Sequence, residues 1–192
     1  TIFPGATEIA NDGIDQDCDL GDTCFVDNDN DGYRTIDTGL TVLSADLDCT
    51  DSGEASSSDP AEDCDDTNSS VKPGVSDFVD DGVDQNCDGF EVCFVDDDSD
   101  GYRNTDTSLT VNSSDLDCDD SGEGSSSEPA TDCDDTASSI NPGATEIVAD
   151  EIDQNCDTDE TCYKDSDNDG FRTTDTSLTV NSNDLDLSLI HI

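Results

Sequence analysis

Apolar side chains form short groups along this chain, separated by long polar stretches, and the same groups recur every 69 residues. In the first copy, Cys24-Phe25-Val26 is followed by Thr35–Leu43, a segment bearing the Thr and Val residues that favour strands. These two segments are predicted to pair as a hairpin. At Ala6–Asn11 the pattern predicts one helical turn at most, because Gly13 disfavours a longer helix.

The polar stretches between these groups predict loops. Ser52–Ser58 is Ser-rich and is expected to form a flexible surface excursion. The expected anchors of a small core are isolated apolar residues at equivalent positions: Ile9, Ile14, Phe78, Val83, Ile147 and Ile152. The predicted fold class is an irregular, small-β tandem repeat with mostly loops, short strands and little helix.

The repeat has a constant length. Pro4-Gly5, Pro73-Gly74 and Pro142-Gly143 mark equivalent turns, and the cysteines keep the same spacing. A register without insertions is typical of a tandem array whose neighbouring copies pack in one repeated way. We predict a first repeat at 1–72, which starts within a repeat, a complete second repeat at 73–141 and a truncated third repeat at 142–192.

The last six residues break this register. The period requires a cysteine at the position of Leu187, but the chain there reads Leu187-Ser188-Leu189-Ile190-His191-Ile192. We expect this hexapeptide to be foreign to a native array that continues beyond Asp186, with a genuine terminal strand as the alternative. Sequencing the gene past Asp186 distinguishes the two.

The charge of the chain excludes several classes of partner. It has 52 acidic and 5 basic residues, a formal net charge of -47 over 192 residues. Such a surface repels nucleic acid and anionic membranes, and no stretch approaches the roughly 20 apolar residues of a membrane span. A chain of this composition is ordinarily disordered. However, its acids lie at fixed offsets beside glycine and cysteine, and small modules with thin cores are commonly stapled by metals or disulfides.

The 10 cysteines indicate an oxidising environment, and we expect an extracellular protein, secreted or at the cell surface. No initiator Met or signal peptide precedes the first repeat, so we expect a mature or excised fragment. Asn68-Ser69-Ser70 and Asn112-Ser113-Ser114 fit the N-glycosylation pattern, which makes glycans candidate partners.

One acidic motif has the spacing of a calcium loop. In Asp27-x-Asp29-x-Asp31-Gly32, alternate carboxylates converge on one ion while glycine makes the sharp turn, and Tyr33 is expected to donate its carbonyl oxygen. The motif recurs as Asp96, Asp98, Asp100 and Tyr102, and as Asp165, Asp167, Asp169 and Phe171. An EF-hand has a bidentate Glu at position 12, where this chain has Thr38, Thr107 or Thr176. Another segment must complete the shell, and the candidates are Asp37, Asp46, Asp48, Asp106, Asp115, Asp117, Asp175, Asp184 and Asp186.

A second set of acids surrounds each Pro-Gly turn. Before the turn lie Asp63, Asp65, Asp66, Asp132, Asp134 and Asp135, and after it lie Asp12, Asp15, Asp19, Asp81, Asp84, Asp88, Asp150, Asp153 and Asp157. Joining the two sides would place acids of adjacent repeats around shared ions, with Glu8, Asp77 and Glu146 as further contributors. Solvated surface charge is the alternative. Oxygen-only ligand sets suit hard cations, so the predicted cofactor is Ca²⁺, several ions per repeat.

These motifs resemble a known repeat family. DCDDT, PGATEI and DGIDQDCD, followed by a cysteine and the DxDxDG loop, are similar to the metal-binding repeats called MopE-like. The resemblance covers nearly every residue of each repeat and implies a large secreted or surface protein. The loop is also similar to that of thrombospondin type 3 repeats, which implies a calcium-wrapped chain. The chain departs from the family at Ala10, Val79 and Val148, where a cysteine is common, and in carrying Cys49 and Cys118. Copper finds no support in a chain without Met and with one His.

Ten cysteines allow many pairings. We favour Cys24–Cys49, Cys93–Cys118, Cys64–Cys87 and Cys133–Cys156, which leaves Cys18 and Cys162 without partners within the chain. A scheme within each repeat, which joins Cys18 to Cys24 and Cys49 to Cys64, uses every cysteine and stays open. The recurring Arg34, Arg103 and Arg172 are expected either to bridge a loop carboxylate to a neighbouring segment or to balance surface charge.

The sequence favours a structural function over catalysis. Every acidic motif recurs with the array, and no His or Lys constellation singles out a base, so we expect the chain not to be an enzyme. We predict an extracellular calcium-binding tandem-repeat protein that forms a stalk, surface layer or filament, with calcium ions and neighbouring repeats or identical chains as partners. The alternative is an adhesin or a calcium-storage or mineral-binding repeat protein.

Overall fold

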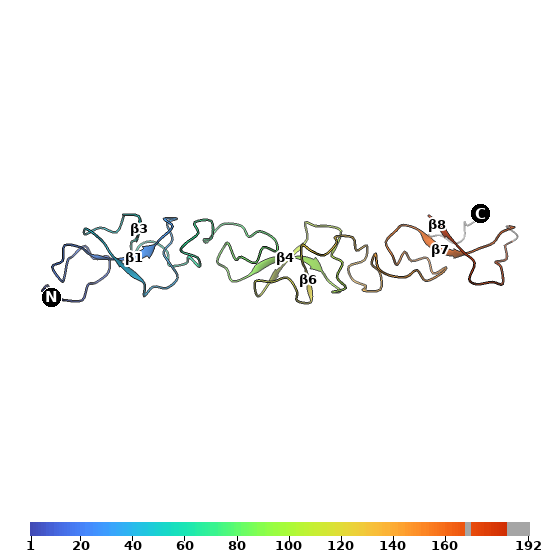
Figure 1. Cartoon of the computed structure of the whole chain (residues 1–192), viewed down its shortest axis with the longest axis horizontal. Helices are drawn as coiled ribbons and strands as arrows, with labels where there is room; N and C mark the ends of the chain where they lie inside the picture. Colours follow the sequence, from blue (N-terminus) through green and yellow to red (C-terminus); the bar gives the residue numbers. More distant parts are fainter. Residues whose placement is uncertain (168–169, 184–192) are drawn as a thin grey trace. The chain divides into compact units, whose positions relative to one another are not determined.

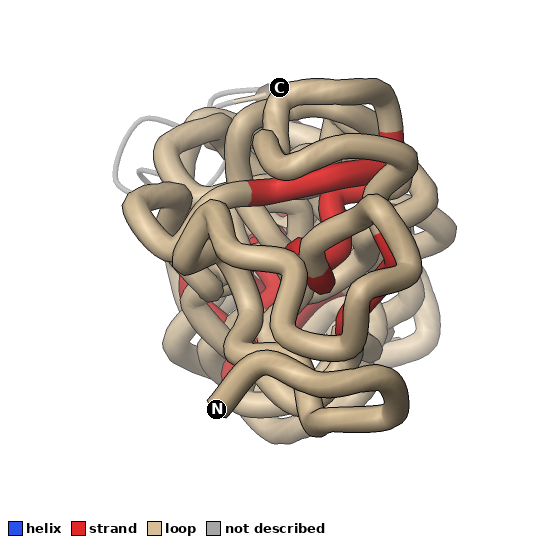
Figure 2. Tube along the Cα trace, turned by 90° about the vertical axis from the view of Figure 1, so that its left-hand side faces the viewer, coloured by secondary structure: helices blue, strands red, loops and turns tan. Residues whose placement is uncertain are grey.

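The computed structural model describes residues 1–167 and 170–183, and within them the chain forms short strands, turns and loops without a helix (Figure 2). Predicted features at Asp169, Asp184, Asp186 and Leu187–Ile192 lie outside the described residues. The chain divides into two compact units, one of Thr1–Phe90 with Ser114–Leu116 and one of Glu91–Ser113 with Asp117 onward. No helix among the described residues is long and apolar enough to cross a membrane.

A three-stranded antiparallel sheet lies in the first unit (Figure 1). Its order is β2-β1-β3, with β1 at Thr23–Asp27, β2 at Thr41–Leu43 and β3 at Gly53–Ala55. The predicted hairpin is confirmed in its pairing, since Phe25 lies opposite Thr41. Only the last part of Thr35–Leu43 is a strand, because Leu40 N bonds back to Asp37 O in a turn.

Strand β3 corrects one prediction, because it lies inside the Ser-rich stretch expected to be a flexible excursion. Glu54 pairs with Val26 of β1, and Gly53 N donates a hydrogen bond to the Asn30 side chain in the acidic loop that follows β1. The Ser-rich stretch is therefore fixed by pairing with β1 and by a hydrogen bond to the acidic loop.

The second unit repeats this sheet with order β5-β4-β6, formed by Glu91–Asp96, Thr110–Ser113 and Gly122–Gly124. It also contains the antiparallel pair of β7 at Glu160–Tyr163 and β8 at Thr179–Ser182. Short strands, long loops and disulfides confirm the predicted fold class.

Acidic side chains, rather than apolar ones, fill the interior. The buried apolar residues in the described chain are Cys24, Cys49, Ala55, Val71, Cys93, Cys118 and Cys162. The largest fully buried side chains include those of Glu91, Glu160, Asp22, Asp63, Asp96 and Asp132. Burying a carboxylate is unfavourable unless hydrogen bonds or cations compensate it, so this interior is stable only with such partners.

The expected apolar anchors are wrong. Ile9, Ile14, Phe78, Val83, Ile147 and Ile152 are between 39 and 68 % exposed. Polar contacts hold these segments instead, since Ile9 N donates to the Oε1 atom of buried Gln16. The helical turn predicted at Ala6–Asn11 is also absent from this described segment, where Asn11 has a φ of 56°.

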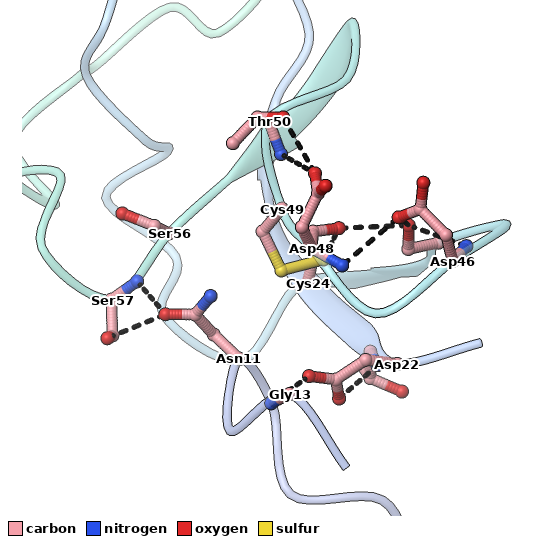
Figure 3. The surroundings of a disulfide bond; sticks show 12 residues. Asn11, Gly13, Asp22, Cys24, Asp46, Asp48, Cys49, Thr50, Ser56 and Ser57 are labelled. Atoms are coloured by element: carbon pink, nitrogen blue, oxygen red, sulfur yellow. Dashed lines mark hydrogen bonds between the residues drawn. A yellow bond between two sulfur atoms is a disulfide. The ribbon is translucent and has the colours of Figure 1, made fainter. Parts of the chain in front are cut away.

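Each unit contains two disulfides, and the four join the pairs that the sequence favoured: Cys24–Cys49, Cys64–Cys87, Cys93–Cys118 and Cys133–Cys156. Figure 3 shows Cys24–Cys49 among hydrogen-bonded loops, where the Asn11 side chain accepts bonds from Ser57 N and Oγ. Cys18 is a free exposed thiol and Cys162 a free buried one. The alternative scheme within each repeat is not the one the structure contains.

Candidate metal centres

The first two DxDxDG loops begin at the last residue of β1 and β4, and the third begins two residues after β7. Asp27 closes β1, and its carboxylate accepts hydrogen bonds from the N–H groups of Asn30, Asp31 and Gly32. Asn30 and Gly32 have φ values of 62° and 91°, so both residues are left-handed, and Gly32 makes the turn that the motif predicts for it. These bonds fold the loop around the Asp27 carboxylate.

Alternate side chains of the loop point inward together. One carboxylate oxygen from each of Asp27, Asp29 and Asp31 lies within 4.8 Å of the others. Both Asp29 oxygens are buried and have no hydrogen-bond partner in the part of the chain that the structure describes. A carboxylate without partners in such a place is strongly unfavourable, and a cation between the three residues removes that cost.

The second loop has the same arrangement. Oxygens of Asp96, Asp98 and Asp100 lie within 4.8 Å of one another, and neither oxygen of Asp98 has a hydrogen-bond partner among residues 1–167 and 170–183. In the third loop, Gly170 N donates to Asp165, and Asp167 is described but Asp169 is not. The carbonyl contributions of Tyr33, Tyr102 and Phe171 stay predictions.

Asp63 is the fourth acid of the first loop. An isolated parallel bridge pairs Asp63 with Thr35, just after the loop, and the Asp63 side chain is fully buried. Its Oδ1 accepts a bond from Asp65 N, while Oδ2 has no hydrogen-bond partner within the described chain. Asp132 takes the same position in the second copy, bridged to Asn104 and 2 % exposed.

The electrostatics of the loop show that these acids face one another. The pKa of Asp29 rises to about 6, first because burial disfavours its charge and then because Asp31, Asp63 and Asp27 repel it. The pKa of Asp98 rises to about 6 for the same reasons, with Asp100, Asp132 and Asp96 as the main repelling groups. Burial also raises the pKa of Asp63 and Asp132. In each of the first two loops, the four carboxylates therefore act on one another electrostatically.

Asp63 was predicted to share an ion with acids of the following repeat, but the acids whose charges it meets are Asp29 and Asp31 of the loop before it and its own neighbours Asp65 and Asp66. Several acids predicted to complete the ligand shell of the loops make local hydrogen bonds. The Asp37 carboxylate accepts a hydrogen bond from Gly39 N, and the Asp48 carboxylate accepts hydrogen bonds from Thr50. Hydrogen bonds from Ser108 and Ser177 lower the pKa of Asp106 and Asp175, respectively. The Asp46 carboxylate accepts hydrogen bonds from Ser44 Oγ and Asp48 N.

The neighbours of Asp63 have supporting positions. Asp66 accepts bonds from the N–H and side-chain amide of Asn28, which tie it to the first loop. Asp135 accepts from Asp97 N and from the Asn104 side chain in the second copy. Asp65 and Asp134 bond Thr67 and Thr136, respectively, and lie at the surface. Asp66 and Asp135 thus fasten the loops, and none of these four acids belongs to a group of converging carboxylate oxygens.

A second kind of acidic group lies after each Pro-Gly turn. Oxygens of Glu8, Asp15 and Asp17 lie within 4.8 Å of one another, as do those of Asp77, Asp84 and Asp88. The Oε2 atom of Glu8 is buried without a hydrogen-bond partner among the described residues. Asp19, the counterpart of Asp88, is not part of the first group, although it accepts a hydrogen bond from Gly21 N as Asp88 does from Phe90 N.

The third copy of this group keeps the same main-chain bonds. Glu146 Oε1 accepts from Asn155 N, and Asp153 accepts from the N–H groups of Asp157 and Thr158. The Glu146 Oε2 atom is buried, again with no hydrogen-bond partner in the described segments. The sequence predicted Glu8, Asp77 and Glu146 only as additional ligands. In the structure, Glu8 and Asp77 belong to the groups of converging oxygens, and Glu146 has a buried oxygen like that of Glu8.

Three predicted ligands have a different role. Asp12, Asp81 and Asp150 accept hydrogen bonds from the Nε2 atoms of Gln16, Gln85 and Gln154, respectively. These buried glutamines also accept bonds from Ile9 N, Phe78 N and Ile147 N. Each Asp–Gln pair holds the loop closed and lies outside the groups of converging oxygens.

Glu54 and Glu123 are half-buried acids that the sequence pattern did not predict as candidate ligands. Each lies on the third strand of its sheet, opposite Val26 or Val95, and its Oε2 atom is buried without a partner in the described part of the chain. Glu123 and Asp96 line one cavity of about 380 Å³. The signal that could have found them is an acid after Ser-Gly that recurs at the period of the loops.

The arginines do not bridge carboxylates in the described structure. Arg34, Arg103 and Arg172 stack on the rings of Phe25, Phe94 and Tyr163 at 4.0–4.1 Å from the ring centroid. Arg34 Nε donates to Asp59 O, and Arg103 Nε donates to Glu128 O. Arg34 and Arg103 thus fasten the segment after each Ser-rich stretch to the sheet by cation–π and main-chain contacts, and Arg172 makes the same ring contact in the third copy.

The comparisons with known proteins agree with this geometry. A family model named for copper binding in MopE, with the description "Putative metal-binding motif", matches residues 1–22, 63–91 and 132–161. Each segment contains a Pro-Gly turn and the acids that follow it, and the second and third segments also contain the acids before it. All three DxDxDG loops lie outside the matched segments. No curated protein and no solved structure matches the chain. The chain therefore contains three segments that match this MopE-type metal-binding motif, one in each repeat.

Proposed function

We propose that this chain is an extracellular calcium-binding tandem-repeat structural protein, in which bound ions stiffen the repeats of a stalk, surface layer or filament. The observation that carries the proposal is the fully buried Asp63, whose Oδ2 has no hydrogen-bond partner in the described chain and whose charge acts on Asp29 and Asp31 of the first loop. A protein with so small an apolar interior gains stability when a cation neutralises such a group.

The chemistry of the donors favours calcium over copper. All converging atoms in the two loops are carboxylate oxygens, which suit hard cations. A further group combines Asp132 with Cys133 and Cys156, but those two sulfurs form a disulfide and are not thiolate ligands. Calcium also tolerates the flexible, many-oxygen shells that such loops offer.

The position of the groups favours a structural role. An ion bound by Asp27, Asp29 and Asp31 together with Asp63 connects segments that are far apart in the sequence, as the disulfides do. The same acids recur in the second copy, so each repeat would be fastened in the same way. We expect no catalysis, because the acids recur as a set and no single base stands apart from them. Four disulfides support an extracellular location.

The test is thermal unfolding of the oxidised full chain in EDTA, in millimolar Ca²⁺ and in millimolar Mg²⁺. At the affinities of extracellular calcium modules, each site adds about 0.4–1.4 kcal/mol of stability at about 1 mM calcium, and the contributions of several sites add up. We expect a large rise in the melting temperature that is specific to calcium. Unchanged melting in EDTA would contradict the proposal, because disulfides alone would then hold the fold.

Calorimetric titration separates the structural role from calcium storage. Structural sites saturate at a small, fixed number of ions per repeat, and the heat of binding ends there. A storage or mineral-binding protein takes up many weak, exchangeable ions without a defined end point. Uptake without a defined end point would favour the storage or mineral-binding function over the structural one.

A further inference from the structure

The third carboxylate of each DxDxDG loop is contacted by the residue before the next Pro-Gly turn. In the first copy, Lys72 Nζ lies 3.6 Å from Asp31 Oδ2. In the second copy, Asn141 Nδ2 donates a hydrogen bond of 2.7 Å to Asp100 Oδ2. Lys72 and Asn141 are one 69-residue period apart, so the two loops differ in the charge of an equivalent neighbour.

The main chain fixes both residues in the same way. Lys72 N donates to Gln85 O at 2.7 Å, and Asn141 N donates to Gln154 O at 2.8 Å. Because Gln85 and Gln154 are buried, the position of the contacting residue does not depend on its side chain. The difference between the two loops is therefore a difference between an ammonium and an amide at a fixed place.

The ammonium of Lys72 lies where it opposes a bound cation. The Asp31 side chain is fully buried and that of Lys72 is 29 % exposed, so solvent screens the pair only in part. The other charged groups facing the loop are the acids Asp27, Asp29 and Asp63, and Lys72 partly neutralises this set. A divalent ion bound to the same oxygens is repelled by Lys72, or displaces it from Asp31. Asn141 orients Asp100 without adding charge.

We propose that the residue before the Pro-Gly turn sets the calcium affinity of the preceding loop, with Lys72 acting as a built-in competing cation. The loop at Asp27–Asp31 then binds calcium more weakly than the loop at Asp96–Asp100. This inference rests on the proposed function, since it assumes that both loops bind calcium. It makes one copy of the array a low-affinity site and the next a high-affinity site.

The test follows the amide signals of Gly32 and Gly101 by two-dimensional NMR during a calcium titration of the oxidised full chain. These N–H groups bond Asp27 and Asp96, respectively, so each reports on its own loop. We expect the Gly32 midpoint at a calcium concentration about tenfold higher than that of Gly101, the scale of one contact to a charged group. Lys72→Asn should lower the Gly32 midpoint and leave Gly101 unchanged, while Asn141→Lys should do the reverse at Gly101.

Lys72→Arg is the matched control, since it keeps the charge and should keep the weak Gly32 midpoint. Equal midpoints in the wild type that Lys72→Asn does not move would overturn the inference while leaving calcium binding intact. If neither glycine responds to calcium, the loops do not bind it, and the proposed function fails with the inference. Thermal unfolding in EDTA gives a second measurement: Lys72→Asn should lower the stability of the metal-free chain, because Asp31 loses its counter-charge.

Discussion

At the scale of single residues, Asp63 and Asp132 show how this protein is held together. Each is a buried acid that a bridge to the residues after a DxDxDG loop brings beside the loop carboxylates. Each keeps one oxygen bonded to a main-chain N–H and has the other buried without a hydrogen-bond partner in the described residues. Such a residue stabilises the fold only when a cation is present, and it weakens the fold otherwise.

Replacing Asp63 with asparagine should therefore have opposite effects in the two conditions. Without metal, Asp63→Asn removes a buried negative charge and should raise stability by about 1 kcal/mol. With calcium, it removes a ligand and should weaken binding at this loop by at least about tenfold. Melting temperatures in EDTA and in calcium measure both effects. Asp65→Asn is the control, since Asp65 lies at the surface and should change neither value much; a loss of stability in EDTA with Asp63→Asn would contradict this account.

The raised pKa values of Asp29 and Asp98 predict an unusual pH dependence. Both values rise to about 6, above the roughly 4 of an unfolded Asp. A raised folded-state pKa gives stability that is present below pH 4 and is lost as pH rises through 6. The metal-free chain should therefore melt at a higher temperature at pH 5 than at pH 7.5. Protons compete with calcium for the same oxygens, so the calcium midpoint should rise as pH falls from 7 to 5.

Melting curves in EDTA and calcium titrations across this range check both directions. Asp29→Asn with Asp98→Asn is the matched variant, and it should flatten the dependence between pH 4 and 6. The lowered pKa values of Asp106 and Asp175 act below about pH 4 and do not interfere. Metal-free stability that rises steadily from pH 5 to pH 7.5 would show that other carboxylates dominate.

At the scale of elements, the buried glutamines after the Pro-Gly turns replace the missing apolar core. Gln85 accepts a bond from Phe78 N and donates to Asp81, while its main-chain carbonyl accepts from Lys72 N. One side chain thus closes the loop from the turn to the second acidic group. The exposed Phe78 contributes to this closure through its main chain only.

Gln85→Leu tests this role. The substitution keeps similar bulk but removes the partners of Phe78 N and Asp81, so the free energy of unfolding should fall by about 2–4 kcal/mol. Gln16→Leu and Gln154→Leu should have comparable effects in their own copies. Urea unfolding in saturating calcium measures the loss, with Thr107→Ala at an exposed position as the control. Wild-type stability in Gln85→Leu would mean that the apolar side chains hold the loop after all.

The sequence predicted those elements whose partners are close in the chain. The DxDxDG loops and the strand pairing of Cys24-Phe25-Val26 follow from short spacings and residue type. The role of Asp63 did not follow, because only a bridge between distant segments brings it to the first loop. The apolar anchors at Ile9 and Ile14 were wrong for a physical reason: this interior is filled by acids and disulfides, so hydrophobicity does not mark burial. Glu54 was missed because its Ser-rich surroundings resemble a disordered loop.

At the scale of the whole molecule, the net charge of -47 opposes any compact state. Disulfides close loops with sequence separations of 23 and 25, which restricts the unfolded chain but leaves the repulsion in place. Bound cations and screening by salt are the two ways to reduce that repulsion. The two differ in selectivity: the loops bind particular cations, whereas screening depends only on ionic strength.

Salt should therefore stabilise the metal-free chain and have less effect on the calcium-bound chain. The Debye length falls from about 30 Å at 0.01 M salt to about 10 Å at 0.1 M, so added NaCl screens most of the repulsion between distant acids. In EDTA, the melting temperature should rise with NaCl over this range, and choline chloride should give the same rise because screening does not depend on the cation. In saturating calcium, the rise should be smaller, because the most crowded carboxylates are already neutralised, while the calcium midpoint itself should increase with salt. A rise seen with NaCl but not with choline chloride would show that sodium occupies the loops, and equal slopes in EDTA and calcium would show that the repulsion lies outside them.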